Sequence, residues 1–313
     1  MKIARSLAEI QRDTRSVVTV GSFDGVHLAH KEIIRTLVSH AAARKGRSVV
    51  VTFDPHPSEV VSSPRGPVGL LTTMDERIKL LSTLDIDLLF IVNFTFEFSR
   101  LTSREFYQSD VVDRLGVSEV VVGYDHMFGR NREAGVQDLV KMGEQFNFSV
   151  HAADPYVVQG VTVSSTEIRS SLMKGDVERA EMLLGYPYFL EGKVVPGDGR
   201  GKVLGYPTAN IEVSSSRKLL PGHGVYLVDV QLEGEHLFGM MNVGIRPTVT
   251  DGTTRTVEVH VFDLHREIYG TDMTVRCLRK LRNEQKFASV KELAVQLEKD
   301  KEVSLRHLAE YKR

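Results

Sequence analysis

Two histidines three residues apart, His27 and His30, stand where a short apolar run is followed by a glycine-containing loop and then by a helical pattern. Glycines let the backbone approach a phosphate closely, and a helix start offers unpaired amides and the positive end of the helix dipole to an anion. Residues three apart share one face of a helical turn, so both imidazoles can donate hydrogen bonds to charge that develops on an α-phosphoryl group. The segment predicts a nucleotide site whose loop residues are Gly21, Ser22, Phe23 and Gly25.

Three other interpretations of this segment remain open. The glycines can simply shape a turn, each histidine can cap the helix or lie on the surface, and two imidazoles make half of a zinc shell. The order of apolar run, glycine loop, His-x-x-His and helix favours a functional role, and no obvious third zinc ligand stands nearby in the sequence.

A second candidate site lies at residues 197–210, where a glycine-rich stretch ends in Pro207-Thr208-Ala209-Asn210. The chain contains no Gly-x-x-x-x-Gly-Lys-Ser/Thr motif, so a kinase activity needs a design other than the P-loop. Thr208 and Asn210 offer oxygens that suit Mg²⁺, and the glycines allow close backbone approach to a nucleotide. An ordinary hairpin loop is the alternative. The residues predicted to bind nucleotide here are Gly197, Gly199, Gly201 and Lys202.

The elements that must position these residues change in kind along the chain. Between Ser16 and about Gly185, short apolar runs alternate with amphipathic helical stretches, which predicts a parallel sheet covered by helices. The expected strands are 17–20, 49–53, 88–92, 120–122 and 148–151. Capping boxes predict three helix starts, at Thr73 with Glu76, Thr102 with Glu105 and Ser164 with Glu167.

After residue 187 the pattern changes to alternating strands separated by glycines, which predicts an antiparallel barrel or sandwich. The clearest strands are 225–230, 237–242, 256–262 and 273–278. A final helix is expected to begin at Ser289 and to dock through Leu293, Leu297, Leu305 and Leu308. With no long linker between the two patterns, we expect two domains, 1–184 and 185–313.

The composition favours a small-molecule partner over a nucleic acid. The 313 residues include 40 basic and 41 acidic side chains, so the net charge of −1 gives no overall field that would attract a phosphate backbone. Cys277 is the single cysteine, in an alternating stretch that predicts an inert core thiol. The sequence shows no apolar signal core and no run long enough to span a bilayer, so we expect a cytoplasmic protein with no membrane partner.

Four segments together resemble the bacterial bifunctional riboflavin kinase/FAD synthetase family. Besides the His-x-x-His segment, they are 52–57 (Thr-Phe-Asp-Pro-His-Pro), 121–129 (Val-Val-Gly-Tyr-Asp-His-Met-Phe-Gly) and 163–169 (Val-Ser-Ser-Thr-Glu-Ile-Arg). The stretch ending in Pro-Thr-Ala-Asn, with 242–248 and 257–260, is similar to the riboflavin kinase part of that family. The resemblance implies a Rossmann-like nucleotidylyltransferase domain followed by a riboflavin kinase β-barrel with a terminal helix. It also implies ATP and Mg²⁺, with riboflavin, FMN and FAD as ligands.

The resemblance also implies roles for individual residues. The two histidines would stabilise the transition state as the FMN phosphate attacks the α-phosphorus of ATP, without a covalent enzyme intermediate. Glu258 would be the general base that takes the proton of the riboflavin 5′-hydroxyl. A second phosphate-binding element would consist of Ser164, Ser165, Thr166 and Arg169, with Arg169 acting in catalysis. The flavin would contact Asp54, Pro55, Pro57 and Arg246, and the adenosine would lie near Gly123 and Asp125.

Three positions depart from the pattern of the family. It usually has Asn where Ser22 stands, Gly where Ala29 stands and Phe where His126 stands. The leading hypothesis is that one chain phosphorylates riboflavin to FMN and then adenylylates FMN to FAD. The alternatives are a riboflavin kinase with an inactive nucleotide-binding domain, and a flavin-binding regulator without enzymatic activity. His260 is expected to be structural.

Overall fold

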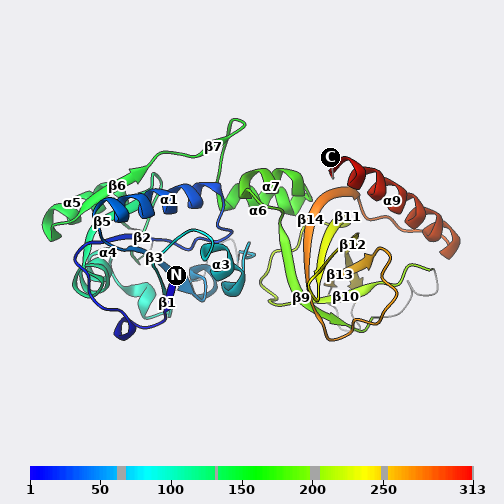
Figure 1. Ribbon diagram of the computed structural model, residues 1–313, viewed down its shortest axis with the longest axis horizontal. Helices are drawn as coiled ribbons and strands as arrows, with labels where there is room; N and C mark the ends of the chain where they lie inside the picture. Colours follow the sequence, from blue (N-terminus) through cyan, green and yellow to red (C-terminus); the bar gives the residue numbers. More distant parts are fainter. Residues whose placement is uncertain (62–67, 131–132, 198–204, 248–252, 312–313) are drawn as a thin grey trace. The chain divides into compact units, whose positions relative to one another are not determined.

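The computed structural model describes residues 1–61, 68–130, 133–197, 205–247 and 253–311. Its contacts divide the chain into two compact units, Met1–Ser165 and Thr166–Arg313. The first contains a sheet with helices and the second contains a barrel, and both can be followed in Figure 1. Each unit is described by itself.

The first unit is built on a sheet whose strands run in the order β1-β4-β3-β2-β5-β6, with every neighbouring pair parallel. All five expected strands are present, which confirms the predicted parallel sheet. The edge strand β1 was not predicted, because three residues are too few to show a pattern. The strands are β1 (Lys2–Ala4), β2 (Ser16–Val20), β3 (Ser48–Asp54), β4 (Leu88–Asn93), β5 (Val117–Gly123) and β6 (Ser149–Ala153).

Helices connect these strands, and two of the predicted capping boxes are confirmed. Thr73 accepts a hydrogen bond from the Glu76 amide at 3.2 Å while the Glu76 carboxylate accepts one from the Thr73 amide at 2.8 Å. Thr102 and Glu105 make the same reciprocal pair. The box at Ser164 stays a prediction. The helices are α1 (Leu28–Ala43), α2 (Pro57–Val60), α3 (Met74–Leu81), α4 (Ser103–Phe106), the π-helical η3 (Tyr107–Leu115) and α5 (Val136–Phe146), with short 3₁₀ turns η1 (Leu7–Glu9) and η2 (Phe98–Arg100).

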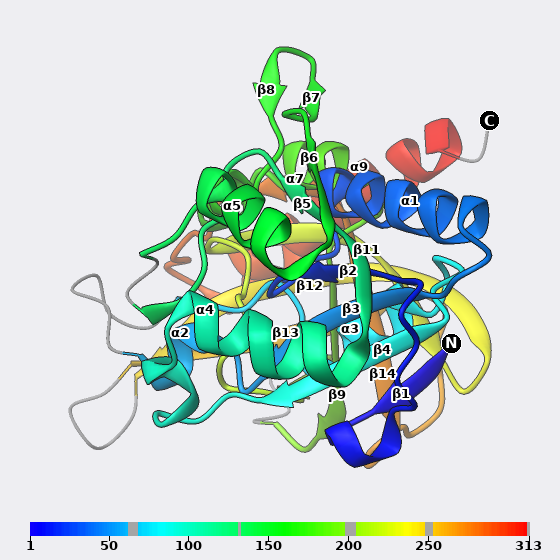
Figure 2. The ribbon, with the colours of Figure 1, turned by 90° about the vertical axis from the view of Figure 1, so that its left-hand side faces the viewer.

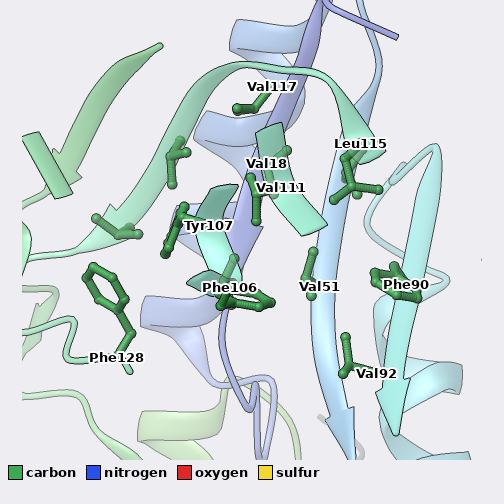
Figure 3. Packing of buried hydrophobic residues seen from close by; sticks show 14 of the residues in the cluster. Val18, Val51, Phe90, Val92, Phe106, Tyr107, Val111, Leu115, Val117 and Phe128 are labelled. Atoms are coloured by element: carbon green, nitrogen blue, oxygen red, sulfur yellow. The ribbon is translucent and has the colours of Figure 1, made fainter. Parts of the chain in front are cut away.

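Both faces of the sheet are covered, because successive residues on a strand point to opposite sides. Val17 of β2 packs with Ile34 and Leu37 of α1, whereas its neighbour Val18 belongs to the cluster that contains Tyr107 of η3. Figure 2 shows α1 on one side of the sheet and α4 and α5 on the other. Figure 3 shows the packing on the second side, where Val18, Val51, Phe90 and Val92 face Phe106, Tyr107 and Val111.

The second unit contains a closed antiparallel barrel in the order β10-β13-β12-β11-β14-β9, which selects the barrel over the sandwich. Cys277 of β14 is fully buried, as expected, and burial raises the pKa of its thiol to about 12. The thiol therefore stays protonated near neutral pH. The strands are β9 (Phe189–Val195), β10 (Ala209–Val213), β11 (Gly224–Leu232), β12 (Glu235–Pro247), β13 (Thr253–Val261) and β14 (Asp272–Arg282).

The terminal helix α9 (Val290–Tyr311) follows Ser289, whose hydroxyl accepts a hydrogen bond from the Glu292 amide at 3.2 Å, so the predicted start is confirmed. Leu308 is buried in a cluster with residues of the barrel. The expectation for Leu305 was wrong, because its side chain is 49% exposed. Asp300 and Ser304, spaced four apart with Leu308, are buried instead and define the docked stripe.

Two further helices, α6 (Ser165–Lys174) and α7 (Val177–Leu184), precede the barrel. Almost all of their residues belong to the second unit, and α7 packs on β14. The Leu172 carbonyl accepts a hydrogen bond from the Gly222 amide at 2.7 Å, and Glu178 accepts one from Arg279 at 3.2 Å. The contacts thus divide the chain after Ser165, whereas the boundary expected from sequence lies after residue 184 and stays a prediction.

Candidate functional sites

The first candidate site lies where the strand order of the sheet reverses. From β2 the chain continues to β3 and β4 on one side, while β5 and β6 lie on the other side of β2. In open parallel sheets, ligands bind beyond the carboxyl ends of strands at this kind of switch point. Gly21, Asp54 and Gly123 stand at the carboxyl ends of β2, β3 and β5, which are neighbours in the sheet. The structure therefore brings three separate sequence motifs to one edge.

The two histidines are in contact with each other at the start of α1. His27 is the N-cap residue, and its Nδ1 accepts a hydrogen bond from the His30 amide at 3.3 Å. A neutral imidazole that accepts through Nδ1 carries its proton on Nε2, so His27 is a donor through Nε2. The two rings stack with centroids 3.5 Å apart. The rings of Phe23 and His30 meet edge to face, with centroids 5.1 Å apart. His27 is buried and His30 is partly exposed.

The loop before His27 has an uncommon backbone conformation. Phe23 has φ 46° and Val26 has φ 36°, in the left-handed region that side chains disfavour, and Gly25 has φ 86°. For a β-branched residue such as Val26 this conformation costs free energy that surrounding contacts must offset. Val26 is fully buried and Phe23 nearly so, which supplies part of that stabilisation.

A buried polar network, which the sequence did not reveal, holds this loop. The Asp24 carboxylate accepts hydrogen bonds from the Leu71 amide at 3.0 Å, the Thr72 amide at 2.8 Å and the Thr72 hydroxyl at 3.0 Å. The Arg77 guanidinium lies 3.8 Å from the same carboxylate, and both side chains are almost completely buried. The Gly25 amide donates to Thr72 Oγ1 at 3.0 Å. The network fixes the loop from residues about fifty positions away in the chain.

The segments assigned to flavin and adenosine flank the histidine loop. Asp54, at the end of β3, forms an ion pair with Arg5 at 3.6 Å and is followed by the cis peptide to Pro55 and by Pro57, the first residue of α2. A Cβ added at Gly123 would lie 3.4 Å from Ile33 of α1. The small residue therefore keeps space between β5 and the helix start, and Asp125 lies exposed just beyond it.

His126 stands where the family usually has Phe. Its ring stacks on Phe128 with centroids 5.2 Å apart and an interplanar angle of 21°. The substitution thus keeps a flat ring in contact with its aromatic neighbour.

The proposed second phosphate element lies at the start of α6. The Ser165 hydroxyl donates to the Asp24 carbonyl at 2.9 Å, which ties this helix start to the histidine loop within the first unit. Ser164 is partly exposed. Thr166 and Arg169 belong to the second unit, where Thr166 is exposed and Arg169 is partly buried.

In the barrel, three polar residues form a row across neighbouring strands. Asn210 of β10 is directly opposite Glu258 of β13, and Glu258 is directly opposite Asn242 of β12. Side chains directly opposite in an antiparallel pair have Cβ atoms about 4.5–5.5 Å apart, so these three can interact. All three are partly exposed. We call this set the Asn210–Glu258–Asn242 row.

The segment that leads into β10 has defined contacts at Gly197 and Pro207. A Cβ on Gly197 would collide with the Asn210 amide, so this glycine lets the backbone pass against that side chain. The His260 imidazole donates a hydrogen bond through Nδ1 to the Pro207 carbonyl at 2.8 Å, next to Thr208. Gly199, Gly201 and Lys202 lie outside the described residues. Arg246 pairs with Thr254 in the β12–β13 ladder, and its side chain is not among those described.

Sequence reasoning did not single out Asn242 or Glu284 as site residues. A Cβ added at Gly244 would lie 2.8 Å from Glu284 Oε1 and 3.1 Å from Asn242 Nδ2, so the carboxylate and the amide both border the position that a side chain at residue 244 would occupy. Glu284 also lies 3.9 Å from His223. Asn242 was visible only as part of a motif, and no local pattern marks Glu284.

Comparisons with known proteins match both units. Residues 9–167 match the family model described as FAD synthetase, and residues 184–308 match the one described as riboflavin kinase. A bifunctional riboflavin kinase/FMN adenylyltransferase from Listeria monocytogenes is 38% identical over 290 residues, covering 93% of this chain and 91% of the relative. The protein of the same description from Escherichia coli K12 is 35% identical over 303 residues and covers 96% of each.

A solved structure has the same fold over nearly the whole chain. A crystal structure described as a macrolide-efflux protein from Streptococcus pneumoniae superposes with a TM-score of 0.86 at 32% identity, covering 97% of this chain and 98% of the other. In the part of the present chain that the structure describes, no helix has the length and apolar composition needed to cross a membrane.

Proposed function

The chain belongs to the family of bifunctional riboflavin kinase/FMN adenylyltransferases, and we propose that the histidine loop of the first unit and the Asn210–Glu258–Asn242 row of the barrel carry its two reactions. It phosphorylates riboflavin to FMN with the γ-phosphoryl group of ATP, and it adenylylates FMN to FAD with release of pyrophosphate. Matches to both family models favour two activities over a kinase alone or a regulator without catalysis.

Adenylyl transfer takes place at the carboxyl edge of β2 and β5. A phosphate oxygen of FMN attacks the α-phosphorus of ATP, and pyrophosphate leaves. His27 and His30 donate hydrogen bonds to the charge that develops on the α-phosphoryl oxygens. The observation that carries this assignment is the stacked histidine pair at the start of α1, at the switch point of the sheet. The loop residues Gly21, Ser22, Phe23 and Gly25 bring backbone amides to the phosphates.

Other segments complete the adenylyltransferase site. Gly123 and Asp125 border the adenosine, and Asp54, Pro55 and Pro57 border the flavin, since both segments share the edge of the sheet with the histidine loop. Ser164, Ser165, Thr166 and Arg169 bind the pyrophosphate portion of ATP, where a helix start and a guanidinium favour negative charge.

Phosphorylation of riboflavin takes place at the barrel. Glu258 accepts the proton of the riboflavin 5′-hydroxyl as that oxygen attacks the γ-phosphorus and ADP leaves. Asn242, directly opposite, positions the Glu258 carboxylate with its amide. Gly197, Gly199, Gly201 and Lys202 cover the ATP phosphates, and Arg246 borders the flavin.

Mg²⁺ fits the start of β10. The Asn210 side-chain oxygen and the Thr208 hydroxyl are hard oxygen donors of the kind this ion prefers, and Gly197, which has no side chain, lets the backbone pass directly against the Asn210 amide. When bound, Mg²⁺ offsets the negative charge of the ATP phosphates. The cytoplasmic location expected from the sequence also stays a proposal.

Two substitutions separate the reactions on one chain. His30→Ala removes a transition-state donor, so FAD formation from supplied FMN falls by roughly 10²-fold or more while FMN formation from riboflavin continues. Glu258→Gln keeps the size of the side chain but removes its basicity, so FMN formation falls while supplied FMN is still converted to FAD. The purified variants are incubated with MgATP and either flavin, and the products are separated chromatographically.

His265→Ala and Glu267→Gln change exposed residues of the same types and serve as matched controls. Loss of both reactions in either test variant, with the fold intact by circular dichroism, contradicts the division of labour between the two sites. An unimpaired reaction removes the corresponding residue from its role.

A further inference from the structure

A second histidine pair lies at the other end of α1. His40 lies in the last turn of this helix, and its Nδ1 is 3.0 Å from Oε1 of Glu119 on β5. His151 of β6 meets His40 edge to face with ring centroids 5.1 Å apart. Three elements thus contribute one ligand-type side chain each, and their ligand atoms all lie within 4.8 Å of one another.

The three side chains converge because of strand register. Glu119 and Val121 are two apart on β5 and therefore point to the same face, and Val121 packs in the cluster that contains α1 residues. His151 is paired with Val121 in the parallel β5–β6 ladder, so it points to that face as well. Helix α1 covers this face of the sheet, and His40 extends from α1 toward it.

We propose that His40, Glu119 and His151 bind a divalent transition-metal ion of the zinc class. Two imidazoles and one carboxylate are a known three-ligand set for Zn²⁺, with water in the fourth position. Zinc bonds of about 2.0–2.2 Å in a tetrahedron place neighbouring donors about 3.3–3.6 Å apart, so the His40 and Glu119 atoms, now 3.0 Å apart, need to separate only slightly. His151 is exposed, so its ring is free to rotate the remaining distance.

The surroundings suit this ion and not Mg²⁺. Imidazole ligands favour zinc, copper and nickel, whereas Mg²⁺ takes oxygen ligands, so this site is separate from the Mg²⁺ of the reactions. The second oxygen of Glu119 lies 2.8 Å from Arg44, which orients the carboxylate as an outer partner of the ligand. The carboxyl end of a helix also carries partial negative charge that favours a cation.

The site is distinct from the phosphate-binding histidines. His30 and His40 are ten residues apart on one helix, which is about 15 Å along its axis. A bound ion joins the last turn of α1 to Glu119 near the amino end of β5 and to His151 in the middle of β6. It leaves His27 and His30 in place.

The test is metal binding to the full chain without nucleotide, using Zn²⁺ in calorimetry and Co²⁺ in visible absorption. We expect one strong site per chain and the absorption of a tetrahedral Co²⁺ centre. His40→Ala and His151→Ala should each weaken binding by about 10-fold or more, because even residues that only support a ligand have effects of this size. His236→Ala, at an exposed histidine of the barrel, is the matched control and should retain binding.

Substitution of His30 excludes the other histidine pair. Binding that survives in His30→Ala and is lost in His151→Ala supports the proposed site. The absence of strong Zn²⁺ binding to the parent chain overturns it, as does a loss of binding in His30→Ala alone. Because His151 is exposed, its replacement tests the site without threatening the fold.

Discussion

At the scale of residues, the histidine loop is held by a buried charge pair, Asp24 and Arg77. Both side chains are almost completely buried. A buried ion pair is stable only if hydrogen bonds also satisfy the donors and acceptors that the pair itself leaves over. Thr72 supplies two of those bonds to Asp24 and a further acceptor to the Gly25 amide. The loop conformation at residues 23–26 is therefore maintained by a buried network rather than by the glycines alone.

Asp24→Asn should destabilise the first unit strongly. The substitution removes the negative charge that lies against the buried Arg77 guanidinium, and breaking a buried pair in this way costs about 3–5 kcal/mol. Thermal unfolding measures the loss, and FAD formation should fall with it because the loop holds His27. Asp75→Asn, at an exposed position of α3, is the matched control. Equal stability of the two variants would show that the pair does not hold the loop.

Ser22→Asn restores the residue usual in the family. The Ser22 carbonyl accepts a hydrogen bond from Thr52 at 3.2 Å, a backbone contact that the new side chain need not disturb. The planar amide of Asn replaces a hydroxyl with two N–H donors and a carbonyl acceptor at the proposed phosphate-binding loop. We expect FAD formation to be unchanged or faster in a kinetic assay with supplied FMN. A collapse of activity would mean that this chain arranges its loop differently.

At the scale of elements, the start of β10 is positioned from β13. His260 holds the Pro207 carbonyl, and its ring contacts Tyr206 with centroids 5.1 Å apart, while the Tyr206 hydroxyl is bonded to Glu298 of α9. Burial raises the pKa of Tyr206 to about 12, so this hydroxyl stays protonated. The terminal helix and strand β13 thus both fix the segment that carries Thr208.

His260 of β13 should make the free energy of unfolding of the barrel depend on pH in the acidic range. Burial lowers the pKa of His260, and nearby Lys301 acts in the same direction, against the Pro207 hydrogen bond and Asp263. In the unfolded chain His260 has a pKa near 6.5, which is higher than its pKa in the folded protein. The free energy of unfolding is therefore unaffected by His260 above about pH 6.5 and decreases as the pH falls below that value.

His260→Gln keeps a donor for Pro207 but removes the titration. Calorimetric scans between pH 7.5 and 5 should show a smaller loss of barrel stability in the variant than in the parent. His265→Gln, at an exposed histidine, should behave as the parent does. A variant whose pH dependence equals that of the parent would remove His260 as the source.

Helix α9 is attached through its buried Asp300 carboxylate, which forms an ion pair with Arg282, as well as through Leu308. Arg282 of β14 holds both oxygens of Asp300 at 2.9–3.0 Å through Nε, and Gln296 donates to the same carboxylate at 2.8 Å. The stripe that docks is therefore partly polar, which explains why a search for leucines alone misplaced Leu305.

At the scale of the whole molecule, the two family matches leave residues 168–183 unassigned, and the structure places all of them in the unit that contains the barrel. Val177, Leu183 and Leu184 of α7 are fully buried. Full burial of such a side chain contributes about 1.5–3 kcal/mol, so α7 stabilises the unit to which it packs.

A comparison of fragments tests this division. Thr166–Arg313 should fold alone and phosphorylate riboflavin, because it keeps α6, α7 and the Asn210–Glu258–Asn242 row. A fragment from Gly185 should be less stable by several kcal/mol, since it exposes the surface of β14 that α7 covers. Thermal unfolding followed by circular dichroism measures the stability of each fragment, and formation of FMN from riboflavin measures its kinase activity. Equal stability would favour the boundary after residue 184.

The sequence by itself determined the order of strands and helices, the change from a parallel sheet to a barrel, and the motifs of both sites. These features are local: alternation, helical period, capping pairs and glycine loops are all contained in stretches of a few to about fifteen residues. The buried strands of the sheet and the start of α9 were predicted for this reason. The edge strand β1 was missed because it offers too short a pattern.

Only the tertiary structure decided which distant side chains meet. Asp24 reaches Arg77, Glu258 faces Asn210 and Asn242, and His40 joins Glu119 and His151. Each meeting depends on the register between strands or on how a helix lies over a sheet, and a shift of one residue would turn every side chain of a strand to the other face. No local pattern encodes that register, because it is fixed by the packing of the whole core.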